Sequence, residues 1–220
     1  MTRFVLHNYW RSSASQRVRT GLHLKGLAFE YVTVNIVAND QFGDAYRVLN
    51  PHTQVPTLVI TELDGTTRVL TQSLAILEYL DERFSGPEYV PLLPRDAYLR
   101  ARSRSLAELV NSGIQPHQNL STIQRMDALE KGAGRKSAIL YNEIGLTAFE
   151  ERVKETAGKF SIGDSPTFAD LCLVPQMYSA RRFEIDVATR FPTLDRIDRA
   201  LNELPAFQAA HPDKQPDAEV

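Results

Sequence analysis

The stretch "YWRSSASQRVR", residues 9–19, decides how the beginning of this chain folds. It overlaps the end of "RFVLHNYW", residues 3–10, which is typical of a β-strand, and the start of "SASQRVRTGLHLKG", residues 13–26, which is typical of a helix ending at glycine. A serine before a helix is usually its N-cap, yet a helix N-terminus also presents unpaired amides that stabilise an anion. The stretch therefore predicts a strand-to-helix junction, and by itself it favours Ser12 or Ser13 as a simple cap.

The rest of the first 84 residues continues to alternate between strand and helix patterns. Strands are predicted for "AFEYVTVNI", "QVPTLVI" and "TRVLT", the last two joined across the hairpin signal Asp64-Gly65. A short irregular helix is predicted for "DQFGDAYRVLNP" and an amphipathic helix for "QSLAILEYLDERF". The predicted order is β-α-β-α-β-β-α.

A proline-rich segment, "SGPEYVPLLPRD", separates this unit from a helical remainder. Beyond it, long helices are predicted at 97–116, 137–158, 167–185 and 193–211, with Pro175 expected to kink or restart the third. The polar tail "PDKQPDAEV" is expected to be mobile. The sequence thus predicts an α/β domain at 1–84, a linker at 85–96 and an all-helical domain at 97–220.

Composition excludes several classes of protein. The chain is 43% hydrophobic and 24% charged with a net charge of −2, which argues against a general binder of nucleic acid or anionic membrane. Its single cysteine, Cys172, forms no intrachain disulfide and lies in an apolar run that favours burial. We find no signal peptide, no membrane-spanning run, no phosphate-binding glycine motif and no metal-ligand spacing, and we expect a cytoplasmic protein.

Two further junctions resemble the first in their chemistry. Pro56 opens a predicted strand, and a cis Val55–Pro56 bond would turn the Val55 backbone outward for an extended peptide, although frequency favours the trans isomer. Gln72 and Ser73 open a helix directly after a strand, where hydroxyl, amide and helix dipole can converge on a carboxylate. Together the three junctions suit different parts of a peptide-like anion.

Five segments in order resemble the zeta-class glutathione transferases, the class that includes maleylacetoacetate isomerase. They are "RSSASQRVR", "QVPTL", "QSLAILEYL", "GIQPHQNLS" and "GDSPTFADLCLVPQMYSARRF", and the first resembles the class motif S-S-C-x-x-R-V-R. The resemblance covers essentially the whole chain. It implies a thioredoxin-like N-terminal domain followed by an all-helical glutathione-transferase domain, with glutathione as cofactor and a homodimeric assembly.

The resemblance also implies roles for individual residues. Ser12 would hydrogen-bond the glutathione sulfur. Ser13 would help to orient that sulfur, and of the two serines it is the one expected to cap the helix. The remaining glutathione contacts would come from the Val55 backbone at Pro56, from Gln72, Ser73 and Gln41, and from Gln115, Asn119 and Ser121 of the helical domain. Lowering a thiol pKa from about 8.5 by about two units needs roughly 2.7 kcal/mol of preferential thiolate stabilisation. A charge-assisted hydrogen bond and a helix terminus together supply that.

One departure from the class motif bears on the chemistry. Ala14 occupies the position of the class cysteine, so the only sulfur nucleophile at the site would be that of glutathione. A diacid substrate needs guanidinium partners, for which Arg11 and Arg182 are candidates. The alternative for Arg11 is a structural ion pair with an acidic residue. The alternative for Arg182 is a solvated helix residue or a salt bridge, a role for which its neighbour Arg181 is better suited.

The expected activity is glutathione-dependent cis–trans isomerisation of maleylacetoacetate to fumarylacetoacetate, in aromatic amino acid catabolism. Alternatives are isomerisation of maleylpyruvate, conjugation or dehalogenation of small electrophiles such as α-halo acids, and a non-catalytic binding module. The segment "IQPHQNLS" fits the maleylacetoacetate pattern better than the maleylpyruvate pattern of histidine and paired arginines. Asp170 fits a capping box with Thr167 and is left out of the site.

Overall fold

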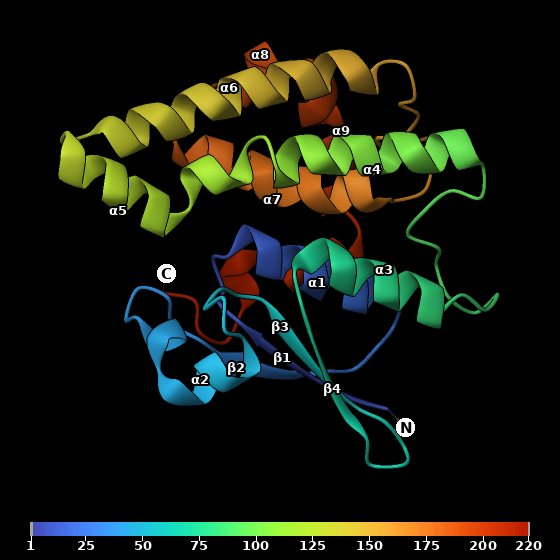
Figure 1. Ribbon diagram of the computed structural model, residues 1–220. Helices are drawn as coiled ribbons and strands as arrows, with labels where there is room; N and C mark the ends of the chain where they lie inside the picture. The colour runs from blue at the N-terminus through green and yellow to red at the C-terminus, as the bar shows by residue number, and fades with distance from the viewer. Residues whose placement is uncertain (1, 220) are drawn as a thin grey trace. The chain divides into compact units, whose positions relative to one another are not determined.

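The structure is a computed structural model that describes residues 2–219. The chain forms two compact units (Figure 1). The first unit runs to Leu92 and takes in the chain from Pro205 onward, and the second unit is Leu93–Leu204. No helix within residues 2–219 combines the length and the apolar character needed to cross a membrane.

The first unit is built on a mixed four-stranded sheet. Its strands are β1 (Arg3–Asn8), β2 (Glu30–Thr33), β3 (Thr57–Thr61) and β4 (Thr67–Thr71), in the spatial order β2-β1-β3-β4. β1 and β2 are parallel, and the other two pairs are antiparallel. The helices are α1 (Ser13–Leu24), α2 (Asp44–Leu49) and α3 (Ser73–Arg83), with a 3₁₀ turn η1 at Asp40–Phe42. This order confirms the predicted β-α-β-α-β-β-α pattern.

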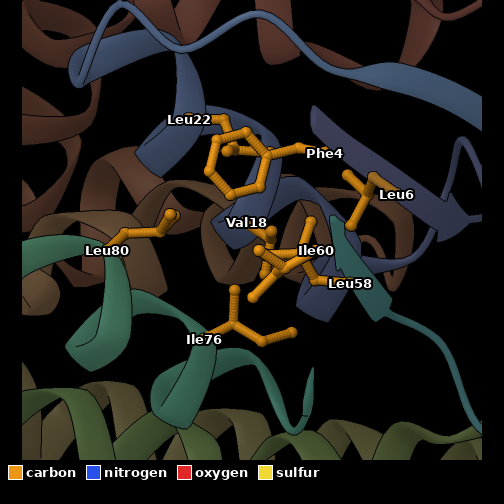
Figure 2. Close-up of a cluster of buried hydrophobic side chains, with 8 residues drawn as sticks. All are labelled: Phe4, Leu6, Val18, Leu22, Leu58, Ile60, Ile76 and Leu80. Carbon is orange, nitrogen blue, oxygen red and sulfur yellow. The ribbon is translucent and has the colours of Figure 1, made fainter. Parts of the chain in front are cut away.

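Helices α1 and α3 lie together on one face of this sheet and enclose its core (Figure 1). Figure 2 shows eight buried side chains that meet there, two from each of β1, α1, β3 and α3: Phe4, Leu6, Val18, Leu22, Leu58, Ile60, Ile76 and Leu80. The strand residues alternate with a period of two and the helix residues are four apart, so each pair faces the same way. Burying each contributes roughly 1.5–3 kcal/mol. The helices are therefore held firmly against the sheet.

Strand register brings the three predicted junctions to one edge of the sheet. Thr57, the first residue of β3, pairs with His7 of β1 on one side and with Thr71 of β4 on the other. The chain leaves β1 toward α1 and leaves β4 toward α3 at this same edge, where the Val55–Pro56 bond also enters β3. Segments far apart in sequence thus meet at one place.

The C-terminal segment differs from the sequence-based expectation. The boundaries 97–220 assigned it to the helical domain, but α10 (Pro205–Ala210) packs with α1 in the first unit, followed by the 3₁₀ turn η3 (Pro212–Lys214). The tail was expected to be mobile, yet the Asp217 carboxylate accepts hydrogen bonds from the Trp10 amide at 3.1 Å and the Tyr31 hydroxyl at 2.5 Å. A polar tail is anchored here because its polar groups have specific partners.

The second unit is helical. It contains α4 (Ala97–Asn111), η2 (Gln115–Gln118), α5 (Leu120–Leu129), α6 (Ala133–Val153), α7 (Phe168–Arg182), α8 (Val187–Arg190) and α9 (Pro192–Asn202). Sequence analysis did not predict α5, and it joined α9 to α10 although the chain breaks helix before Pro205. Pro175 was expected to kink or restart its helix; α7 continues through it, so the helix does not restart there. Cys172 is fully buried in α7, as predicted.

Candidate functional site

Ser12 caps the first helix. Its backbone is extended, with φ −70° and ψ 118°, and its Oγ accepts a hydrogen bond from the Ser15 amide at 3.2 Å. Ser13 is the first residue of α1, so the expectation that Ser13 is the cap is wrong. Only a residue outside the helix can turn its hydroxyl back onto the amide of the first turn. Because Ser12 Oγ acts as acceptor in this bond, its hydrogen remains available for donation to an anion.

The residues beside Ser12 are half-buried and offer cationic and small side chains. The Arg11 guanidinium lies 5.3 Å from the centroid of the Trp10 ring, a cation–π geometry. No carboxylate within residues 2–219 forms an ion pair with Arg11, so the structural alternative considered for it is not observed. Ala14 lies in the first turn of α1 and presents only a methyl group.

A buried arginine of α1 holds the loop that precedes Ser12. Arg19 Nη2 donates to the Trp10 carbonyl at 2.9 Å, and Nη1 donates to the Tyr9 carbonyl at 3.3 Å and to Asn8 Oδ1 at 2.9 Å. Burial lowers the pKa of Arg19 to about 10, and the nearby Tyr31 and Asp217 oppose that shift. The guanidinium therefore stays charged at neutral pH and fixes the junction.

Ser73 is the first residue of α3, directly after the N-cap residue Gln72, so its hydroxyl also lies at a helix N-terminus. It is buried, and its Oγ accepts a hydrogen bond from Arg17 Nη1 at 3.2 Å. An arginine only donates, so the Ser73 hydrogen also remains available for an anion. The preceding Gln72 has φ +69°, a left-handed conformation that is uncommon outside glycine and frequent at functional sites.

Sequence analysis missed Arg17, although it lies within the opening stretch. Arg17 and Arg19 lie two positions apart on a helix predicted to pack against a sheet, and this spacing was the available signal that they do not both reach solvent. Arg17 and Arg19 are both almost fully buried, whereas Arg11 precedes the helix and is only half-buried. The buried pair organises the two junctions from within the unit.

The loop before β3 presents its backbone. The Val55–Pro56 bond is cis, so the trans isomer favoured by frequency is wrong. The loop is tethered at the Gln54 carbonyl, which accepts from the Tyr46 hydroxyl at 2.6 Å and from Asn50 Nδ2 at 2.7 Å. No hydrogen bond to another residue between 2 and 219 engages the Val55 backbone. Its N–H and C=O are therefore open to an extended peptide.

Tyr46 and Asn50 are structural supports that the sequence did not reveal. Both also contact Thr57 Oγ1, at 2.9 and 3.2 Å, and all three residues are buried. They lie in and just after α2, so no local pattern connects them with the junction. Burial raises the pKa of the Tyr46 phenol, which remains a neutral donor.

Gln41 is a buried carboxamide with unused hydrogen-bonding capacity. Its Nε2 makes one long bond of 3.4 Å to the Ile36 carbonyl, and its Oε1 has no partner among the described residues. A buried polar atom normally has a partner, so this side chain is suited to a polar ligand.

The candidate residues of the second unit lie on η2, α5 and α7. Gln115 Nε2 donates to Asn119 Oδ1 at 2.5 Å, so these two side chains are together, whereas Ser121 is exposed on α5. Arg182 is exposed near the end of α7. Its neighbour Arg181 pairs with Asp195 at 3.0 Å and Asp198 at 2.7 Å, which confirms the structural role expected for it.

The segment η2 is anchored by features that sequence analysis did not identify. Gln118, Asn142 and Gln176 form a hydrogen-bonded amide cluster from η2, α6 and α7, with bonds of 2.5–3.1 Å. His117 stacks on Tyr141 with ring centroids 3.4 Å apart. These contacts fix the chain that carries Gln115 and Asn119.

Asp170 is structural, as expected from the sequence. It completes a capping box with Thr167 and also accepts from the Ser161 amide at 2.9 Å. Burial raises the pKa of this carboxyl in spite of those hydrogen bonds.

The first unit fits glutathione in its donor set. Two serine hydroxyls have their acceptor side occupied and their hydrogens available, each at a helix N-terminus, which suits a thiolate and a carboxylate. The Val55 backbone suits a peptide group, and the unpartnered oxygen of Gln41 suits an N–H donor. Within the described part of the chain, no group of three or more His, Cys, Asp and Glu residues could hold a metal ion.

Comparison with protein families gives two matches. The model for the glutathione S-transferase N-terminal domain matches residues 11–83, and that for the C-terminal domain matches residues 143–205. A probable maleylacetoacetate isomerase of Caenorhabditis elegans is 46% identical over 97% of this chain and 95% of its own length.

Solved structures agree with these matches. Maleylacetoacetate isomerase from Anaeromyxobacter dehalogenans 2CP-1, with glutathione bound in its active site, has a TM-score of 0.91 and 50% identity over 99% of both chains. Another structure of that protein holds dicarboxyethyl glutathione and citrate, with a TM-score of 0.90, 49% identity and coverage of 100% of this chain and 99% of that one. A maleyl pyruvate isomerase of the zeta class has a TM-score of 0.88 and 37% identity, covering 98% of this chain and 100% of its own.

Proposed function

Because the chain belongs to the zeta-class glutathione transferase and maleylacetoacetate isomerase family, we propose that it is a glutathione-dependent cis–trans isomerase that converts maleylacetoacetate to fumarylacetoacetate. One observation carries most of this proposal. Ser12 and Ser73 both accept an internal hydrogen bond and so keep a hydroxyl hydrogen for an anion, at two helix N-termini on one edge of the sheet. Glutathione carries a thiol and carboxylates, which are the groups such donors bind.

When bound, glutathione supplies a thiolate that adds reversibly to the cis double bond and so permits rotation about it. Ser12 donates its hydroxyl hydrogen to the sulfur and favours the ionised form over the thiol. The N-terminus of α1 adds its positive dipole end at the same place. The Ser15 amide, by bonding Ser12 Oγ, keeps the hydroxyl in its donating orientation.

Other residues bind the remaining parts of the cofactor. Ser73 and Gln72 hold the γ-glutamyl end, with Arg17 orienting the Ser73 hydroxyl from behind. The Val55 backbone pairs with the cysteinyl backbone, and Gln41 holds the glycyl end. Gln115, Asn119 and Ser121 contribute from the helical unit, where the Gln115–Asn119 hydrogen bond presents two amides together.

Arg11 and Arg182 bind the substrate carboxylates. Arg11 lacks a carboxylate partner within residues 2–219, so its charge is available to a diacid, and Trp10 supports its guanidinium plane. The structure of the relative with dicarboxyethyl glutathione supports a diacid rather than a neutral substrate. Because Ala14 replaces the class cysteine, we assign no protein thiol to the reaction.

The enzyme acts as a cytoplasmic homodimer on small molecules, in the catabolism of aromatic amino acids. The function is tested by supplying maleylacetoacetate and glutathione with a coupled fumarylacetoacetate hydrolase. Glutathione-dependent turnover is expected. Dehalogenation of an α-halo acid without isomerisation would favour the conjugation alternative, and isomerisation of maleylpyruvate alone would favour that substrate. Absence of a bound thiolate band near neutral pH and of retention on immobilised glutathione would favour a non-catalytic module.

A further inference from the structure

The backbone immediately before Ser12 is held from two sides. From α1, Arg19 Nη2 donates to the Trp10 carbonyl at 2.9 Å. From the C-terminal segment, Asp217 Oδ2 accepts the Trp10 amide at 3.1 Å. Both polar groups of one peptide residue, two positions before Ser12, are thereby fixed. The Ser12 amide in turn donates to the Tyr9 carbonyl at 3.1 Å, so the constraint continues into the cap.

Asp217 also joins this loop to the rest of the unit. Its Oδ1 accepts the Tyr31 hydroxyl at 2.5 Å, which connects it to β2. Its charge lies near the buried Arg19 guanidinium and favours the protonated form of that side chain. Arg19 further donates to the Ala210 carbonyl of the C-terminal segment, from Nη2 at 3.2 Å and from Nε at 3.3 Å.

We propose that Asp217 is a positioning residue of the sulfur site, which acts through Trp10 and Arg19 to direct the Ser12 hydroxyl. The proposal rests on the proposed function, since it presumes that Ser12 donates to a glutathione thiolate. Hydrogen bonds to a thiolate depend steeply on direction, so a loop that can shift weakens this donor. Asp217 holds the Trp10 amide, whereas Arg19 holds the Trp10 carbonyl, so the carboxylate supplies the second of the two side-chain anchors of this residue.

The role is separable from the folding of the C-terminal segment. That segment packs through α10, where Phe207 and Ala210 are fully buried, and Asp217 lies seven positions beyond Ala210. Removing the carboxylate leaves the α10 contacts in place. We therefore expect the variants to change the pKa of the bound glutathione thiol while leaving the urea midpoint of unfolding nearly unchanged.

The test compares Asp217→Ala, Asp217→Asn and Tyr31→Phe with Glu219→Gln, an exposed carboxylate of the same tail that serves as matched control. The pKa of the bound glutathione thiol is measured by titrating its ultraviolet thiolate absorbance, together with kcat, the KM for glutathione and the urea midpoint. For Asp217→Ala we expect the thiol pKa to rise by about one unit and kcat/KM at pH 7 to fall roughly threefold, as the thiolate fraction does.

Asp217→Asn keeps one carbonyl acceptor and should recover part of the loss, Tyr31→Phe should give a smaller shift, and Glu219→Gln should match the wild type. If the wild-type protein lowers the thiol pKa and Asp217→Ala lowers it equally, the positioning role of Asp217 is wrong while the proposed function stands. A wild-type thiol that titrates as free glutathione overturns the proposed function as well. If Asp217→Ala does not fold, Asp217→Asn and Tyr31→Phe decide, and wild-type thiol pKa values in both overturn the proposal.

Discussion

Replacing Ser12 by alanine removes two interactions of different size and consequence. The first is the cap on the Ser15 amide at 3.2 Å, whose loss costs about 1 kcal/mol of folding stability. The second is the donated hydrogen bond to the thiolate, for which hydrogen bonds to charged groups suggest about 1.5–3 kcal/mol. At 1.36 kcal/mol per unit, that raises the thiol pKa by about one to two units. With a wild-type thiol pKa about two units below 8.5, the thiolate fraction at pH 7 and with it kcat/KM should fall roughly 3- to 25-fold.

Matched variants separate the cap from the chemistry. Ser12→Gly also lacks the hydroxyl but costs only a few tenths of a kcal/mol as a cap, so it should lose the same activity with less instability. Ser13→Ala changes the first helical residue, which is not the cap, and should retain most of the rate. The assays are coupled isomerisation, the thiolate titration and urea unfolding. Equal, small rate losses in Ser12→Ala and Ser13→Ala would refute the assignment of Ser12, as would full activity in Ser12→Gly.

Substitutions at four other residues test separate parts of the structure. Arg182→Ala should raise KM for diacids more than for neutral electrophiles, and an equal change for both would remove it from the substrate site. Arg19→Lys should lower unfolding free energy by roughly 2–4 kcal/mol in urea denaturation, because an ammonium cannot reach all the carbonyls that the guanidinium fork binds. Asp170→Ala should cost about 2–4 kcal/mol by leaving two buried amides unpaired, with Asp170→Asn losing less; wild-type stability in both would contradict the capping role. Burial, and after it the charge of Arg19, lowers the pKa of His23 below 6.5. The contribution of neutral His23 to the free energy of unfolding is therefore full above pH 6.5 and is lost as the pH falls from 6.5 through the lowered pKa. His23→Asn should flatten this part of the dependence of the urea midpoint on pH, and an unchanged dependence would contradict the prediction.

The local patterns predicted most of the first unit because its elements are short and strongly marked. The period of two in β1 and β3, the period near four in α1 and α3, and the Asp64-Gly65 turn each give a distinct signal. The three junctions were found for the same reason, since a polar pair directly after a strand is visible in sequence. The three junctions meet at one edge of the sheet because Thr57 pairs with His7 and with Thr71. The local sequence pattern of a strand does not show which residues of other strands it pairs with.

What could not be predicted depends on long-range contacts. The support of the Val55 loop by Tyr46 and Asn50 and the anchoring of Trp10 by Asp217 join polar residues that look ordinary in sequence. The cap was assigned to the wrong serine because two serines in a row give the same local signal, and the backbone angle distinguishes them. The tail was expected to be mobile because its composition is polar, and the hydrogen bonds of Asp217 to Trp10 and Tyr31 anchor it instead.

The central claim is that Ser12 at the start of α1 ionises a bound glutathione thiol for isomerisation of a cis diacid. The most direct measurement is the pH titration of thiolate absorbance in the glutathione complex, for the wild type and Ser12→Ala, alongside coupled turnover of maleylacetoacetate. We expect a wild-type thiol pKa about two units below the free value of about 8.5, return toward that value in Ser12→Ala, and a parallel fall in turnover. A wild-type thiol that titrates as free glutathione, or turnover that does not require glutathione, would contradict the claim.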